Sequence, residues 1–244
     1  MDLNLDKLRK LRLTTEKLNS SLSIETSKLM DEYYLKEYLV KLQQHIGAAN
    51  MKVAASIFIK RYAFLSVIYL YTMTSNNKRL NISFKNVSLE TKDSDELWLP
   101  CFYFHHLNVQ ALEGNRQDWR ASSIEILFKE HISPILNNLS YVTKLSKLVL
   151  WENIAVYIFW LYETVLLEEG ISQNVVKRAE EDFQSILSPT SNKLFGDYSE
   201  NPLARYYKGE LGTTSRKRIT CCYSHLTNSD KYCTTCPHIS KEKN

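Results

Sequence analysis

Four of the five cysteines lie close together towards the C-terminal end of the sequence, and their spacing indicates a metal centre. Cys221, Cys222, Cys233 and Cys236 form the pattern Cys-Cys, ten residues, Cys, two residues, Cys. A Cys-x-x-Cys turn lets two sulfurs face one metal, and Pro237 stiffens the chain directly after it. Because thiolates are soft ligands, this set favours an iron–sulfur cluster or zinc over hard cations.

The adjacent pair of cysteines favours an iron–sulfur cluster, although the residues alone leave zinc open. Structural zinc sites usually combine two short Cys-x-x-Cys turns, and the adjacent Cys221 and Cys222 depart from that pattern. Neighbouring side chains of an extended segment point apart, so bringing both onto one small ion strains the backbone. A cluster with two irons offers ligand positions that lie further apart. His225 and His238 lie in the same segment and are alternative zinc ligands.

The composition indicates an ordinary globular protein without a targeting segment. The 244 residues are 44% hydrophobic and 24% charged, enough for one good-sized domain or two small ones. A net charge of +4, mixed with many acids, does not suggest nucleic-acid binding. Asp2 and Asp6 stand where a signal peptide would need basic residues. We therefore expect a cytoplasmic protein, in which a cysteine cluster indicates metal chemistry before disulfides.

The most apolar stretch, residues 148–167, is expected to be a buried core helix. A transmembrane helix needs about 20 predominantly apolar residues. Glu152, Asn153 and Glu163 interrupt this stretch, so we expect no transmembrane segment. Cys101, the fifth cysteine, stands in another apolar run and is expected to be a small buried hydrophobic residue.

Apolar residues recur mainly at helical spacing, which predicts an α+β fold that is mainly α-helical. The expected helices cover residues 26–44, 50–74, 121–130, 148–165 and 172–187. Pro134 should kink or restart the chain after the third of these. Apolar and polar residues alternate from Leu80 to Leu89, with a bulge, and residues 97–104 form a continuous apolar run. We therefore expect an antiparallel β-hairpin, or a small sheet, inserted between the helices.

The same pattern suggests three regions along the chain. Residues 1–25 are charged and punctuated by leucine, which suits an N-terminal arm or a marginal helix. Residues 26–191 form the mainly helical domain, with the hairpin near residues 80–106. Residues 192–244 form a loop-rich segment that carries the cysteine cluster. The sequence contains no internal repeat.

Polar and charged residues near the cysteines, or in helices that must support them, are candidates for a role at the site. Arg216, Lys217 and Arg218 directly precede the cysteines, where they would tune a cluster, attract an anionic ligand or dock an acidic donor protein. A solvated basic loop is the alternative. Trp151 is a candidate for the wall of a substrate pocket, although a Trp on an apolar helical stripe is usually core. Glu152 and Asn153 either bind backbone groups of the cysteine loop or face solvent.

The complete cysteine pattern resembles that of the FhuF-type ferric-siderophore reductases, and it matches without insertion or deletion. Other segments are also similar to that family; they are Lys60-Arg61-Tyr62, Trp151-Glu152-Asn153, Asn201-Pro202-Leu203 and Arg216-Lys217-Arg218-Ile219-Thr220. Together the similar segments extend over roughly residues 45–240. The resemblance implies that Cys221, Cys222, Cys233 and Cys236 all ligate one [2Fe–2S] cluster.

The resemblance also implies a function. It implies an iron–sulfur oxidoreductase that transfers one electron to siderophore-bound Fe(III), of the hydroxamate type, and so releases Fe(II) in the cytoplasm. No flavin or nicotinamide motif is present, so an external low-potential donor such as a ferredoxin or flavoprotein is required. The protein would lie in the cytoplasm or peripherally on the inner face of the membrane. Three rival hypotheses are a zinc-stabilised helical protein, an iron–sulfur sensor and a siderophore-binding protein without redox activity.

Overall fold

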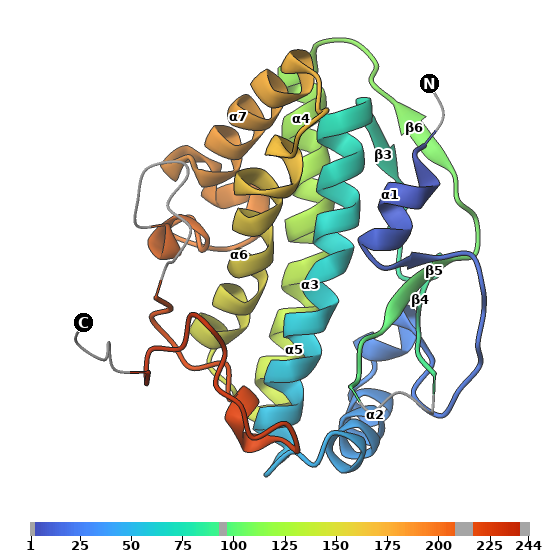
Figure 1. The fold of residues 1–244 in the computed structure, drawn as a ribbon, viewed down its shortest axis with the longest axis vertical. Coiled ribbons are helices and arrows are strands. Elements are labelled where there is room, and N and C mark those ends of the chain that lie inside the picture. The colour runs from blue at the N-terminus through green and yellow to red at the C-terminus, as the bar shows by residue number, and fades with distance from the viewer. Residues whose placement is uncertain (1–2, 93–96, 208–216, 240–244) are drawn as a thin grey trace.

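The fold is a layer of helices flanked by two small β-sheets, as the computed structural model in Figure 1 shows for residues 3–92, 97–207 and 217–239. The α-helices are α1 (Leu5–Lys10), α2 (Glu32–His45), α3 (Met51–Asn76), α4 (Arg116–Glu125), α5 (Ser133–Thr143), α6 (Lys147–Glu163) and α7 (Gln173–Leu187). The strands are β1 (Leu13–Thr14), β2 (Ile24–Glu25), β3 (Lys78–Leu80), β4 (Val87–Glu90), β5 (Cys101–Phe104) and β6 (Val109–Ala111). The predicted fold class, α+β and mainly α-helical, is therefore confirmed.

Helix α3 is the centre of the fold because it is apolar around nearly its whole circumference. The side chain of Asn50 accepts a hydrogen bond from the Val53 N–H and caps the first turn. Asn77, at φ 49°, ends the helix in the left-handed conformation that asparagine tolerates well. Helix α6 packs along α3, and both helices run in the same direction (Figure 1). Burial on all sides explains the all-round apolar composition of α3.

Helices α4 and α5 are joined end to end by a π-helical turn, Ile126–Ile132. The predicted effect of Pro134 is confirmed, because the chain restarts as α5 with this proline in its first turn. Proline has no N–H to donate to the preceding turn, and a π-helical turn accommodates the lost bond. The turn also directs the side chain of His131 into the protein interior.

The expected hairpin is present as the antiparallel pair β4–β5, in which Leu89 lies opposite Phe102. The N-terminal residues complete this sheet, because β1 pairs in parallel with β5 and β2 pairs antiparallel with β4. The alternation expected to continue past Leu80 does not form a strand there; β3 ends at that residue and pairs with β6. Strand β5 buries Phe102 and Phe104 but leaves Cys101 and Tyr103 partly exposed, so the expected burial of Cys101 is wrong.

A buried charge network closes the end of the helical layer remote from the cysteines. Asp182 on α7 is fully buried and accepts two hydrogen bonds from Arg116, at 2.8 and 2.9 Å. Thr74 of α3 donates a third bond to the same carboxylate, at 2.8 Å. Arg120 lies 3.5 Å away. The carboxylate thereby joins α3, α4 and α7.

Two helical stretches, α3 and Lys147–Leu167, are long and apolar enough to cross a membrane by length and composition alone. Within their most apolar windows, 89% and 67% of the residues are buried inside the protein. Packing of the two helices against each other and against the rest of the core accounts for this composition.

Candidate metal centre

The four cysteines lie on a segment, residues 217–239, that contains one short 3-10 turn and otherwise no regular structure. Cys222 and Cys236 are buried, whereas Cys221 and Cys233 are partly exposed. The sulfurs of Cys222 and Cys233 are 3.6 Å apart. Two sulfurs that share a tetrahedral metal at about 2.3 Å each lie about 3.8 Å from one another. This pair is therefore placed as two ligands of one metal would be.

The backbone around the adjacent cysteines turns sharply. Tyr223 has φ +60°, and its N–H donates a hydrogen bond of 3.3 Å to the Cys221 sulfur. At the other half of the motif, the Cys236 N–H donates to the Cys233 carbonyl at 2.9 Å, which forms the expected tight turn. The sulfur contact joins Cys233 to Cys222, across the two halves, rather than to its neighbour in the turn.

Of the four cysteine sulfurs, those of Cys222 and Cys233 are in contact with each other. In the part of the chain that the structure describes, no three His, Cys, Asp or Glu side chains converge as the ligands of a single ion would. Each iron of a [2Fe–2S] cluster takes two thiolates, so the pair Cys222–Cys233 suits one iron. Cys236 is close enough to act electrostatically on the Cys221 thiol.

The charges around Cys222 favour its thiolate form. Cys233 and Cys222 share a hydrogen bond, and the Lys60 ammonium lies 3.6 Å from the Cys222 sulfur. The bond from Cys233 and the charge of Lys60 hold the pKa of Cys222 well below its usual range, and Ser224 adds to the effect. The same bond raises the pKa of Cys233. Burial raises the pKa of Cys221.

A carboxylate from α6 holds the chain directly before the cysteines. Glu152 accepts hydrogen bonds from the backbone N–H groups of Ile219, at 2.6 Å, and Thr220, at 2.7 Å. The Thr220 hydroxyl donates to the same carboxylate. Arg218 lies 3.7 Å from Glu152, and both side chains are almost completely buried. The expectation that Glu152 binds backbone groups of the cysteine loop is confirmed.

Asn153, the next residue of α6, links the cysteine segment to α3. Its carbonyl oxygen accepts a 2.8 Å bond from Arg218, and its amide donates to the backbone and hydroxyl oxygens of Ser56. The Ser56 hydroxyl in turn donates to the Cys222 carbonyl at 2.9 Å. A continuous chain of hydrogen bonds therefore runs from α6 through α3 to a candidate ligand.

The segment is also fixed to the turn between α2 and α3. The Ala49 N–H donates to the Leu226 carbonyl at 3.0 Å, and the Asn228 N–H donates to the Ile46 carbonyl at 3.0 Å. Gly47 has φ +56°, and the Asn228 side chain fills the space that a Cβ atom would need there. Glycine thus permits both the turn and the close approach of the segment.

The remaining candidates from the sequence lie in different environments. Arg216 lies outside the described residues. Lys217 is exposed and donates to the Ile239 carbonyl at 3.0 Å. Arg218 is only 5% exposed, so it is not part of a solvated loop, and its guanidinium faces α6 rather than an external ligand.

Trp151 and the histidines also have clear positions. Trp151 is 2% exposed and its indole N–H donates to the Tyr198 hydroxyl at 3.0 Å. It is thus a core residue, although it also lines a small pocket of about 200 Å³ with Tyr198. His225 lies 4.0 Å from the Cys221 sulfur and stacks on Tyr232, and the His225 and His238 rings are 6.4 Å apart.

Ser56 and Lys60 were not among the candidate site residues, although both contact Cys222. Their polarity could have indicated a role at the site, because both residues interrupt the otherwise apolar surface of α3. A polar residue in an all-round apolar helix needs a partner. The partner here lies more than 160 positions away in the sequence, so it is not evident from local pattern.

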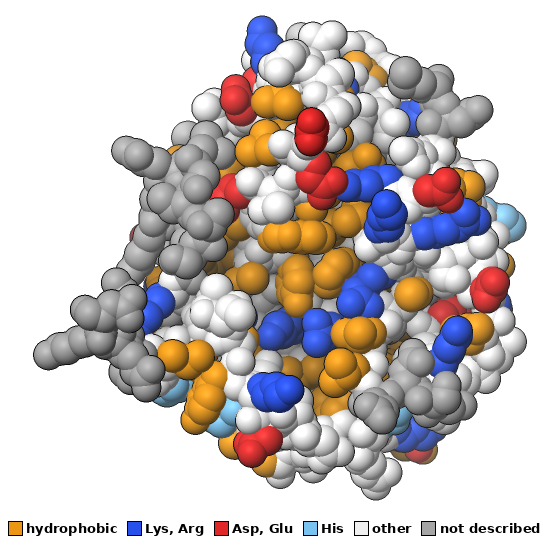
Figure 2. Space-filling view, viewed as in Figure 1, with side chains coloured by type: hydrophobic (Ala, Val, Ile, Leu, Met, Phe, Trp, Pro, Cys, Tyr) orange, Lys and Arg blue, Asp and Glu red, His pale blue; other side chains and the backbone are white. Residues whose placement is uncertain are grey.

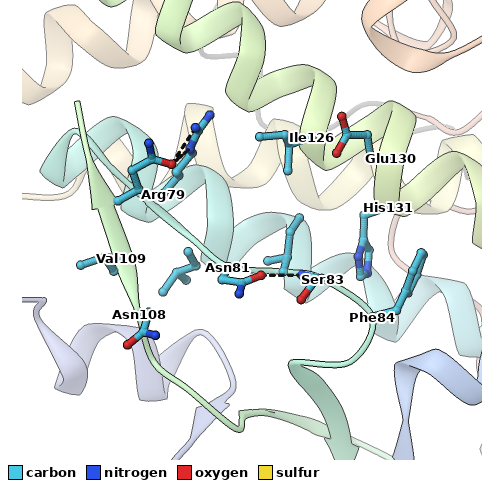
Figure 3. Close-up of a pocket in the computed structure, with 12 residues that line it drawn as sticks. Arg79, Asn81, Ser83, Phe84, Asn108, Val109, Ile126, Glu130 and His131 are labelled. Atoms are coloured by element: carbon cyan, nitrogen blue, oxygen red, sulfur yellow. Dashed lines mark hydrogen bonds between the residues drawn. The ribbon is translucent and has the colours of Figure 1, made fainter. Parts of the chain in front are cut away.

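A larger pocket of about 550 Å³, shown in Figure 3, lies beside β3 and the π-helical turn and contains none of the predicted site residues. At one end, the ring of His131 stacks on Phe84 with 4.4 Å between ring centres. The His131 Nε2 and the Tyr62 hydroxyl are 2.7 Å apart. Burial lowers the pKa of His131 to about 3, so the imidazole is neutral.

Comparison with known proteins identifies a family. The model of the family described as "Ferric iron reductase FhuF-like transporter" matches residues 56–207, which is more than half of the chain. No curated protein and no solved structure matches the chain. The matched span includes Ser56, Lys60, Glu152 and Asn153, which hold the cysteine segment, and it ends before the cysteines. The chain belongs to the ferric iron reductase FhuF-like family.

Proposed function

We propose that the protein is a ferric-siderophore reductase whose four cysteines hold a [2Fe–2S] cluster. The observation that carries the proposal is the docked cysteine segment, with the sulfurs of Cys222 and Cys233 at 3.6 Å, in a chain of a ferric iron reductase family. When bound, such a cluster supplies a low-potential one-electron relay. The site we propose lies in the cytoplasm, or at the inner face of the membrane.

The chain's own residues position the ligands and set their charge. Glu152 and Ser56 fix the backbone on either side of the adjacent cysteines through hydrogen bonds. Lys60 places a positive charge beside the Cys222 sulfur, which offsets part of the negative charge that four thiolates bring. Neighbouring groups that donate to sulfur or stand beside it with positive charge raise the reduction potential of a centre.

In the proposed reaction, one electron from a low-potential ferredoxin or flavoprotein reaches the Fe(III) of the siderophore complex. The donor is oxidised, Fe(III) becomes Fe(II), and the siderophore is released chemically unchanged. Fe(III) is a hard ion that anionic oxygens hold strongly, whereas they hold Fe(II) weakly. Each tenfold preference of the siderophore for Fe(III) lowers the potential of its complex by about 59 mV, so the donor must have a low potential.

The proposal is tested by metal content and by two matched variants. Protein purified without oxygen should be red-brown and contain about two irons and two sulfides per chain. Cys233→Ser should lose the visible absorption and the reduction of ferric siderophores, whereas Cys101→Ser should keep both, because Cys101 lies on β5. A colourless protein with one zinc would overturn the proposal. A coloured protein that fails to accelerate reduction, when given a low-potential donor, would indicate a sensor instead.

A further inference from the structure

A surface beside the cysteine segment combines positive charge with aromatic rings. We call it the basic–aromatic face; its residues are Arg12, Lys60, Arg61, Phe64, Tyr157 and Trp160. Figure 2 shows hydrophobic side chains gathered in the middle of this side of the molecule, over α3 and α6, with Lys and Arg side chains among them. Lys60, Arg61 and Phe64 lie on one face of α3 because residues three and four apart are neighbours on a helix.

The aromatic rings of this face form one connected layer between the two helices. The Phe64 ring centre is 4.7 Å from that of Tyr157 and 6.1 Å from that of Trp160. Trp160 is 37% exposed although most residues around it on α6 are buried. Arg12 lies over the Phe64 ring, with its guanidinium carbon 4.7 Å from the ring centre. The Tyr157 and Trp160 rings are inclined to the Phe64 ring by 51° and 57°, so the layer offers an uneven apolar surface edged by a cation.

The cations of the face have no carboxylate partner among the residues that the structure describes. Arg61 donates to the Tyr157 hydroxyl at 3.3 Å, and its buried Nε has no hydrogen-bond partner. Arg12 donates to the Leu99 carbonyl, and the neighbouring charge of Arg61 adds to burial in lowering the pKa of Arg12. Like charges held together without a counter-ion favour the binding of an anion.

The face continues directly to the candidate metal centre. Lys60, next to Arg61 in the chain, contacts both the Cys222 sulfur, at 3.6 Å, and the Ser224 hydroxyl, at 3.1 Å. A ligand that Arg61 holds over the aromatic layer is therefore one helical residue away from the side chain that contacts the Cys222 sulfur.

We propose that the basic–aromatic face binds the ferric chelate and selects chelates that carry a net negative charge from carboxylate groups. This inference rests on the proposed function. Three hydroxamate anions cancel the charge of Fe(III), so a neutral trihydroxamate complex offers the guanidinium groups no anionic partner. A chelate with carboxylates does, because arginine pairs with carboxylates through two parallel hydrogen bonds. The aromatic layer suits the apolar linkers between the chelating groups.

The test separates binding from reduction by replacing Fe(III) with Ga(III), which has the same charge and is not reduced. We would titrate the iron-loaded protein with the Ga(III) complex of a citrate-based siderophore and with that of a neutral trihydroxamate, using calorimetry and tryptophan fluorescence. The anionic complex should bind at least tenfold more tightly. Its affinity should fall as salt is added, whereas that of the neutral complex should not.

Variants of Arg61 give the second arm of the test. Arg61→Gln should weaken binding of the anionic Ga(III) complex by about tenfold, which is the value of one charge-assisted hydrogen bond. Arg61→Lys should retain part of the affinity. Lys177→Gln, which removes an exposed charge from α7, should change nothing. The visible absorption of each variant shows whether its cluster and fold are intact. If Arg61→Gln does not fold, the salt dependence of chelate binding to the unaltered protein tests the inference instead.

Three outcomes would overturn the inference. The first is equal affinity for the anionic and neutral complexes. The second is an Arg61→Gln variant with unchanged affinity for the anionic complex. The third is an Arg61→Gln variant whose KM rises for the ferredoxin only, which would make the face a docking surface for the donor. In each case reduction of ferric siderophores would continue, so the proposed function would stand. Conversely, iron-loaded protein that binds the anionic complex but reduces no ferric siderophore would contradict the proposed function alone.

Discussion

Glu152 shows at the scale of one residue how a charged side chain supports a site that it does not line. Its carboxylate is buried in the apolar helix α6, yet it accepts two backbone N–H groups and a hydroxyl and lies beside Arg218. A buried charge is tolerated only when its hydrogen bonds and its counter-ion are present together. Loss of the carboxylate therefore leaves a buried guanidinium and two N–H groups without their partner.

We predict that Glu152→Gln loosens the cysteine segment and shortens the lifetime of the bound iron. The amide accepts fewer of the existing hydrogen bonds, and breaking a buried ion pair costs about 3–5 kcal/mol. Iron content and visible absorption during incubation with a chelator measure the effect. Glu180→Gln, on the exposed side of α7, serves as the matched control. Equal iron retention in both variants would show that Glu152 does not hold the centre.

The sequence reveals some residues of this site and conceals others for a physical reason. The four cysteines are evident because their type and spacing suit only a few chemistries. Glu152 and Asn153 are evident because a polar side chain in an apolar helix needs a hydrogen-bond partner. Ser56 is not evident, because a small hydroxyl is common in buried helices, where it usually bonds its own backbone. Its bond to Cys222 depends on tertiary packing.

At the scale of elements, the π-helical turn between α4 and α5 has a consequence for stability. The turn places His131 against Tyr62 of α3, with their polar atoms 2.7 Å apart. Burial lowers the pKa of His131 to about 3, from an ordinary value of 6.5, and raises that of Tyr62. Both groups are therefore neutral in the folded protein at any pH near neutrality.

Because the folded protein binds the His131 proton more weakly than the unfolded chain does, this histidine makes stability fall with acid. The contribution of His131 to the free energy of unfolding is present above pH 6.5 and is lost as the pH falls towards 3. Between pH 7 and pH 5 the loss should be about 2 kcal/mol. Urea denaturation at the two pH values measures it. His131→Gln should reduce the acid sensitivity, whereas the exposed His106→Gln should leave it intact; identical sensitivity in all three proteins would contradict the prediction.

The network around Asp182 joins three helices, so we predict that replacing this one side chain strongly lowers the free energy of unfolding. Asp182→Ala leaves Arg116 and Thr74 without their buried partner, which should lower the free energy of unfolding by about 3–5 kcal/mol. Chemical denaturation measures the loss. The adjacent but exposed Glu181→Ala should change stability by less than about 0.5 kcal/mol. A similar small change for Asp182→Ala would mean that water replaces the carboxylate without cost.

Helices could be predicted more reliably than strands, because their stabilising contacts are local. Helix α3 and helix α7 begin and end close to the expected residues, since Asn50, Asn77 and Gly170 carry local signals. The two-residue strands β1 and β2 carry no such signal, and they exist only because β5 and β4 offer unpaired edges. The alternation is interrupted at residues 81–86, which form no strand, and resumes as β4.

At the scale of the whole molecule, the cysteine segment is attached to a helical body that is largely complete without it. The segment contributes no helix of the core, and the family match ends at residue 207, before it begins. Its contacts with the body are mostly hydrogen bonds to α3, α6 and the turn before α3. In the proposed function, the helical body therefore supports the segment and the segment supplies the metal ligands.

We predict that a chain that stops after Tyr207 still folds its helices but binds no iron. Without the segment, Glu152 and Asn153 become accessible to water, which replaces the lost hydrogen bonds at moderate cost. Far-UV circular dichroism should retain its helical signal, and the thermal transition should remain cooperative at a lower Tm. Full-length Cys233→Ser, which keeps the segment but not the ligand set, separates the effect of iron from that of docking. Loss of the helical signal on truncation would show that the segment belongs to the folding core.

The hydrogen bonds that fix residues 226–228 to residues 46–49 also bear on how the protein is made. Chains fold from the N-terminus as they leave the ribosome, and these two parts are separated by nearly the whole helical body. Gly47, whose left-handed backbone and missing Cβ admit the Asn228 side chain, leaves the ribosome before the cysteines are made. The surface that receives the segment is thus synthesised before the four cysteines, so under the proposed function we expect iron insertion to be a late step in biogenesis.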